Sequence, residues 1–245
     1  APLAWMMRSR VLLGVWLPAF LVSLSISAVA VEDDLLAPVL LFTAGAVVGL
    51  GALARRSRSF PGAAPVLTVM GFVPYLGVLY ALTFPEGVRD LSPVYSGDPL
   101  ERLYFWIPLA AAVVTWVLAL RGNRKADEPE RPGVQETAVL AALLLFGVWY
   151  LGGFPGFEDW VAASVFNLLF LAHAVLMIRE GPRQARMAQT VAGCLLFSLL
   201  AFTRYIDLFD SLIARGLVFL GVGIALFITG SRYARSKNAA AEEAP

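Results

Sequence analysis

The sequence predicts an all-α integral membrane protein, a polytopic bundle of about eight transmembrane helices with both termini in the cytoplasm. Three observations lead to this prediction. The residue types A, V, I, L, M, F, W, Y and C make up 59% of the 245 residues. Only 15% are charged, against about 25% in a soluble domain. The apolar residues form long runs, and Lys and Arg gather in every second connection between them.

Eight segments are long and apolar enough to cross a bilayer, which takes about 20 residues in a helix. A membrane strand would instead alternate apolar and polar residues over about ten positions. The predicted spans are residues 11–31, 35–54, 63–84, 103–120, 137–154, 160–178, 187–205 and 212–230. The first span also resembles a signal peptide, because Arg8 and Arg10 precede it, but its long apolar run favours a retained helix.

The basic residues predict the orientation. Fifteen of the 19 Lys and Arg residues flank one set of alternate connections, within residues 8–10, 55–58, 121–131, 179–186 and 232–237. The other four are Arg89, Arg102, Arg204 and Arg215. Basic residues mark the cytoplasmic side of membrane proteins, so both termini are expected there. The expected location is the bacterial cytoplasmic (inner) membrane.

The chain divides into two halves of four predicted spans. Residues 1–120 hold spans one to four with an outer loop at 85–102, and residues 134–235 hold spans five to eight. Residues 121–133 form a cytoplasmic linker, and the polar tail 236–245 is expected to be disordered. The outer loop contains three prolines and two glycines, which favours a solvated connector over a small ordered cap.

Composition and missing motifs exclude several functions. A net charge of +1 offers no basic field for nucleic acid. One Cys and one His cannot build a zinc site or an iron–sulfur cluster within the chain. No Asp, Glu or Lys is predicted deep in a span, which argues against an ion-coupled transporter. Common catalytic motifs are missing, so no enzyme is expected. The expected partners are the lipid bilayer and other membrane subunits.

Two polar residues, Asn167 and His173, lie inside the sixth predicted span. A neutral imidazole there can form an interhelical hydrogen bond, contributing about 0.6–2 kcal/mol, or ligate a haem iron or a chlorophyll magnesium. A single histidine cannot supply both axial ligands, and Met177 on the same helix cannot reach the opposite ring face. The hydrogen bond without a cofactor is therefore favoured, with haem or chlorophyll at His173 as the alternative.

The most distinctive polar cluster lies at the outer end of the last predicted hairpin and contains Arg204, Tyr205, Asp207, Asp210 and Arg215. Arg204 and Asp207 are three residues apart and can pair if the helix continues. Asp210 can cap the final helix. Arg215 lies one turn inside and needs an acidic partner or must extend outward. A structural clasp that closes the hairpin is favoured over a small polar site facing the outer compartment.

Aromatic and small residues predict how the helices are placed and packed. Gly45 and Gly49 have the small-xxx-small spacing of close helix packing, and the lone Cys194 is expected in the core. Aromatic side chains near span ends are expected at the level of the lipid headgroups. The expected anchors are Tyr80, Phe84, Tyr104, Trp106, Trp149, Tyr150, Trp160 and Tyr205 at the outer ends and Trp5, Trp16, Trp116 and Tyr233 at the inner ends.

The C-terminal third contains the run Arg204-Tyr205-Ile206-Asp207-Leu208-Phe209, followed by Arg215-Gly216 and a glycine-rich last span. On these residues, the segment 166–237 resembles the end of a bacterial family of polytopic membrane proteins known only as a domain of unknown function. That family has Arg-Tyr-Phe-Asp-Leu-Phe at the corresponding place. The resemblance implies that Arg204 and Asp207 belong to a deliberate feature, and it implies no reaction.

These observations favour a structural or accessory subunit of a larger membrane complex. The alternative is a facilitator for a small neutral or amphipathic solute, with Arg204, Asp207 and Arg215 at its outer mouth. A pigment- or haem-binding subunit is the third possibility. A membrane enzyme would need the loop acids to converge near Glu158 or Asp159; these are Glu86, Asp90, Asp98 and Glu101.

Overall fold

The computed structural model describes residues 10–56, 62–91, 98–121, 134–152, 158–183 and 187–207, with a few isolated positions beyond them. Within these ranges the regular elements are all helices, and seven are long and apolar enough to cross a membrane. They are α2 (Arg10–Val31), α3 (Leu36–Arg56), α4 (Ala63–Ala81), α6 (Pro99–Arg121), α7 (Val134–Gly152), α8 (Asp159–Arg183) and α9 (Met187–Asp207), with the short helices η1 (Asp33–Leu35) and α5 (Pro85–Arg89) between them. The all-α prediction is confirmed. The predicted eighth span and the tail 236–245 lie outside the ranges.

Three helices extend at least three residues beyond the predicted spans at their polar ends. Helix α6 begins four residues earlier than predicted, where Asp98 accepts a hydrogen bond from the Leu100 backbone N–H at 2.9 Å. Helix α7 begins at Val134, so Gln135 and Glu136 lie in its first turn. Helix α8 continues to Arg183. Hydropathy identifies only the apolar part of a helix, so the polar residues at its ends were not included in the predicted spans.

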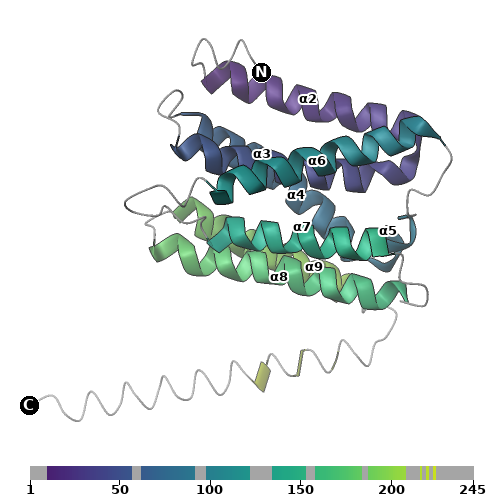
Figure 1. The fold of residues 1–245 in the computed structure, drawn as a ribbon. Coiled ribbons are helices and arrows are strands. Elements are labelled where there is room, and N and C mark those ends of the chain that lie inside the picture. The colour runs from purple at the N-terminus through teal and green to yellow at the C-terminus, as the bar shows by residue number, and fades with distance from the viewer. Residues whose placement is uncertain are drawn as a thin grey trace, which may run out of the picture.

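Helix α3 lies at the centre of the bundle. It contacts α4, α6 and α7, and 78% of its most apolar stretch is buried. Figure 1 shows α2, α3 and α6 on one side, α7, α8 and α9 on the other, and α4 between them. Helix α9 packs on α8, and only 11% of its most apolar stretch is buried.

The predicted close packing at Gly45 and Gly49 is confirmed. A methyl group added to Gly45 would overlap the side chain of Leu143 in α7, and one added to Gly49 would lie 3.0 Å from Thr115 Oγ1 in α6. The Trp116 indole also donates a hydrogen bond to the Gly45 carbonyl at 3.1 Å. Small residues in α3 therefore let α6 and α7 approach its backbone.

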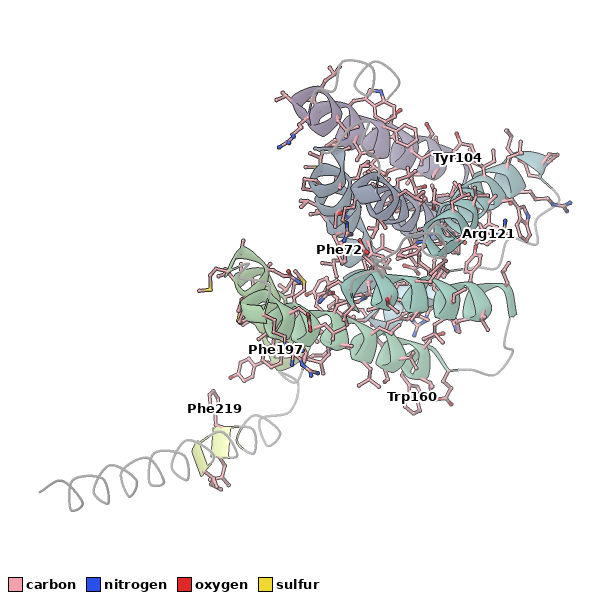
Figure 2. All side chains as sticks on the ribbon, turned by 60° about the vertical axis from the view of Figure 1, so that its left-hand side comes forward. Phe72, Tyr104, Arg121, Trp160, Phe197 and Phe219 are labelled. Atoms are coloured by element: carbon pink, nitrogen blue, oxygen red, sulfur yellow. The ribbon has the colours of Figure 1, made fainter. Side chains whose placement is uncertain are left out.

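Two expected headgroup anchors lie in the core instead. Trp116 and Tyr150 are each 3% exposed. The Tyr150 ring stacks on Phe105 of α6, with a centroid distance of 5.1 Å. Both side chains fill space between helices near their ends, where burial was not predicted. Trp160 is exposed as expected and points away from the bundle in Figure 2.

The expected core position of Cys194 is wrong. The thiol is exposed on α9. Helix α9 contacts the described part of the bundle chiefly through α8, so most of its circumference faces outward. An apolar residue type in a membrane helix therefore does not specify burial among other helices, because lipid is equally apolar.

The first part of the outer loop is an ordered helix. Helix α5 packs on α8, Val88 is buried, and the Arg89 Nε lies 3.1 Å from Asp159 Oδ2. The Pro at the start of α5 suits a first helical position, because its missing N–H would have no partner there. The preference for a solvated connector is therefore wrong for residues 85–89.

Candidate functional site

His173 is buried at the junction of three helices. Its Nε2 lies 2.7 Å from the Tyr75 hydroxyl oxygen of α4, and its Nδ1 lies 3.4 Å from the Gln135 Oε1 of α7. Its side chain is only 1% exposed and Tyr75 is 0% exposed. The expected interhelical hydrogen bond is therefore present. We call Tyr75, Gln135 and His173 the His173 cluster.

Both ring nitrogens of His173 have polar neighbours. The Tyr75 hydroxyl can donate to Nε2 or accept from it, depending on the imidazole tautomer, and the Gln135 amide offers Nδ1 an oxygen acceptor or a nitrogen donor. The ring is thus held between α4 and α7.

The same contacts do not fit a haem or chlorophyll ligand at His173. An axial ligand presents an uncoordinated ring nitrogen to the metal. Here Nε2 is in hydrogen-bond contact with Tyr75, and Nδ1 faces Gln135. Phe72 also packs edge-on against the ring, with a centroid distance of 6.4 Å. A metal could approach only after the cluster had been taken apart.

Arg204 of α9 reaches across to α8 and α4. Its Nε donates to the Asn167 Oδ1 at 3.1 Å, and its guanidinium also donates to the Thr83 carbonyl. The guanidinium carbon lies 4.7 Å from the centroid of the Phe84 ring, a distance typical of a cation–π contact. We call Arg204, Asn167, Thr83 and Phe84 the Arg204 cluster.

The Thr83 carbonyl is the shared acceptor of this cluster. It also accepts a hydrogen bond from the Asn167 Nδ2 at 2.8 Å. Thr83 lies two residues past the end of α4, near the last carbonyls of the helix, which lack intrahelical partners and carry the negative end of the helix dipole. An arginine is therefore favourable at this position. The cluster holds the ends of α4 and α9 on α8.

The expected pair of Arg204 with Asp207 stays a prediction. The structure shows two partners of Arg204 that were not predicted, Asn167 and the Thr83 carbonyl. The side chain of Asp207, together with Asp210 and Arg215, lies outside the described residues. The Tyr205 ring contacts Phe219 edge-on, with a centroid distance of 5.7 Å. The clasp thus connects helices from both predicted halves of the chain.

An ion pair between Arg55 and Glu136 joins the end of α3 to the start of α7. The Glu136 side chain is 4% exposed and the Arg55 side chain 44%. Glu136 lies in the first turn of α7, one residue before the predicted span, so it is not an acid deep in a span. An acid is favourable in the first turn of a helix, because it faces the positive end of the helix dipole.

The site residues predicted from the sequence did not include Tyr75, Thr83, Gln135 and Glu136, and Phe84 was expected as a headgroup anchor. Tyr75 carried a usable signal, because a hydroxyl in the middle of an apolar span needs a partner. Glu136 carried one as well, because it lies three residues after Gly133 and acids are enriched in the first turn of a helix. A backbone carbonyl such as that of Thr83 leaves no trace in the sequence.

In the described ranges the structure contains no group of three or more His, Cys, Asp or Glu residues that could hold a metal ion. Glu158 and Asp159 are the two acids near which a membrane enzyme would gather the loop acids. Asp159 pairs with Arg89, and the Glu158 carboxylate accepts from the Trp160 indole.

Comparisons with protein-family models, with curated proteins and with solved structures found no match. The resemblance of the C-terminal third to an uncharacterised membrane family stays a prediction. Functional inference therefore rests on the two clusters and the Arg55–Glu136 pair.

Proposed function

We propose that the protein is an accessory subunit of a larger assembly in the bacterial cytoplasmic membrane. The observation that carries this proposal is that the buried His173 and the half-buried Asn167 and Arg204 are all used within the bundle. His173, Asn167 and Arg204 each bind groups of neighbouring helices in the same chain. Such contacts position helices, which is what a scaffold requires.

Position-specific photo-crosslinking in native membranes tests this proposal. A photoreactive amino acid replaces Phe197 in α9, Ile107 in α6 or Val15 in α2, all of which are exposed. A scaffold should give a discrete protein adduct from one of these faces, and the matching complex should survive purification in mild detergent. Ala174 is fully buried and serves as the control position. Lipid adducts alone at all three faces, with recovery as a lone monomer, would count against the proposal.

A facilitator for a small neutral or amphipathic solute is the second candidate. One observation favours it, because His173 and Asn167 lie between helices rather than on the outer surface. Solute entry into liposomes containing the purified protein tests this candidate. It predicts faster entry than into protein-free liposomes, together with a change in rate for Asn167→Leu. Equal rates with and without protein would eliminate it.

A further inference from the structure

Helix α4 passes from one apolar core to another in the middle of its length, and α3 contributes to both cores. Ala63, Ala64 and Leu67 belong to a small apolar core that they share with α2 and α3. Tyr75, Val78, Leu79 and Leu82 belong to the main core instead. The change occurs between Met70, which packs on the small core, and Phe72, which packs on the main one.

The first half of α4 is tightly attached to α3. A methyl group on Gly71 would lie 2.9 Å from the Ala44 carbonyl oxygen and 3.0 Å from the Val48 nitrogen. On the opposing helix, a methyl group on Gly51 would lie 3.4 Å from the Ala64 carbonyl oxygen. Backbones this close cannot shift past each other without a steric clash. This half of α4 therefore moves together with α3.

The second half of α4 is attached to α8 and α9. Tyr75 binds His173, and the Thr83 carbonyl binds Asn167 and Arg204. Helix α5 continues the attachment through the Arg89–Asp159 pair. The attachments to α8 thus begin at Phe72, whose ring packs edge-on against His173, and the hydrogen bonds begin at Tyr75.

Pro74 lies between the two halves. Proline has no backbone N–H, so the helical hydrogen bond to the Met70 carbonyl cannot form, and the ring crowds that carbonyl. A methyl group added to Gly77, one turn later, would meet no described atom within 4 Å. The helix is therefore weakest near the place where it passes from one core to the other.

The Arg55 end of the bundle, where α3 ends and α7 begins, is held together across this division by polar contacts. One is the Arg55–Glu136 ion pair, and another is the approach of Gln135 to His173. We propose that α4 bends at Pro74 so that the Arg55 ends of α2, α3 and α4 separate from α7, α8 and α9. In this device the Arg55–Glu136 pair is the latch that holds the closed arrangement.

Electron spin resonance distance measurements in lipid nanodiscs test this proposal. One spin label is attached to the native Cys194 of α9, the single cysteine of the chain, and the second to Leu50→Cys in α3. Leu50 is exposed and precedes Arg55 by five residues. The closed arrangement gives one main distance. Arg55→Ala and Glu136→Gln should each add a population at longer distance.

The hinge is tested by restoring the helix in the unlatched protein. Pro74→Ala combined with Arg55→Ala should reduce the long-distance population. Pro108→Ala replaces another interior proline, in α6. Combined with Arg55→Ala, it should leave the long-distance population unchanged. Arg89→Ala breaks an ion pair at the opposite end and should leave the wild-type distance unchanged.

Two results would overturn the proposal. The latch is refuted when both Arg55→Ala and Glu136→Gln give the wild-type distance distribution. The hinge is refuted when Pro74→Ala leaves the long-distance population intact. Each variant is first checked for a monodisperse elution profile. Because Arg55→Ala and Glu136→Gln break the same pair from opposite sides, either one that folds supplies the answer.

Discussion

The hydrogen bond between Tyr75 and His173 yields the sharpest stability prediction. Tyr75→Phe removes one hydroxyl and keeps the ring, so it creates no large cavity. It leaves the His173 Nε2 without its 2.7 Å partner at a site where both side chains are buried. Interhelical hydrogen bonds in membrane proteins contribute about 0.6 kcal/mol on average and about 1.7 kcal/mol at most. Full burial places this bond in the upper half of that range, at about 1–1.7 kcal/mol.

Reversible unfolding by SDS in mixed micelles, followed by tryptophan fluorescence, measures this loss. Tyr80→Phe is the matched control, because Tyr80 lies on the same helix and its ring packs on Phe84 and Phe170. A double-mutant cycle with His173→Leu should return a coupling energy of about 1 kcal/mol. Equal effects of Tyr75→Phe and Tyr80→Phe, with no coupling to His173, would refute the reasoning.

Three further predictions concern packing, the clasp and the orientation. Gly71→Ala should destabilise the protein by about 1–3 kcal/mol in the same unfolding assay, because the added methyl group meets the α3 backbone. Gly77→Ala should be neutral or slightly stabilising, because its methyl group meets no described atom. Arg204→Lys should lower the free energy of unfolding by about 1–2 kcal/mol although the positive charge is kept. The ammonium group of lysine cannot reproduce the planar set of N–H donors with which Arg204 reaches two acceptors. The orientation is tested with a membrane-impermeant maleimide added to intact cells that express a cysteine-free background. Glu86→Cys should react with the maleimide and Arg124→Cys should not. The reverse pattern would contradict the predicted orientation.

The sequence predicted the helices well, because each has a continuous apolar run of the length that a bilayer demands. It predicted the polar contacts less well. Asn167, His173 and Arg204 were identified as unusual residues, since polar groups are costly inside a membrane. The observed partners of Arg204, Asn167 and the Thr83 carbonyl, were not predicted because only local spacing was available. The observed partners lie 37 and 121 positions away along the chain.

Burial of a side chain among other helices was the property that the sequence predicted least well. In a soluble protein an apolar side chain indicates the core, but in a bilayer the same side chain fits lipid equally well. Cys194 was placed inside and lies outside, whereas Trp116 and Tyr150 were placed at the surface and lie inside. The residues that did predict burial were Gly45 and Gly49, because a missing side chain is useful only where another helix comes close.

The central place of α3 has a consequence for biosynthesis. This helix enters the bilayer second among those described, but two of its neighbours, α6 and α7, are translated much later. The indole that binds the Gly45 carbonyl leaves the ribosome 71 residues after that glycine. Until then, the face of α3 that later contacts α6 and α7 must contact either lipid or the insertion machinery. A chain arrested before α6 is complete should therefore be a good substrate for membrane quality-control proteases.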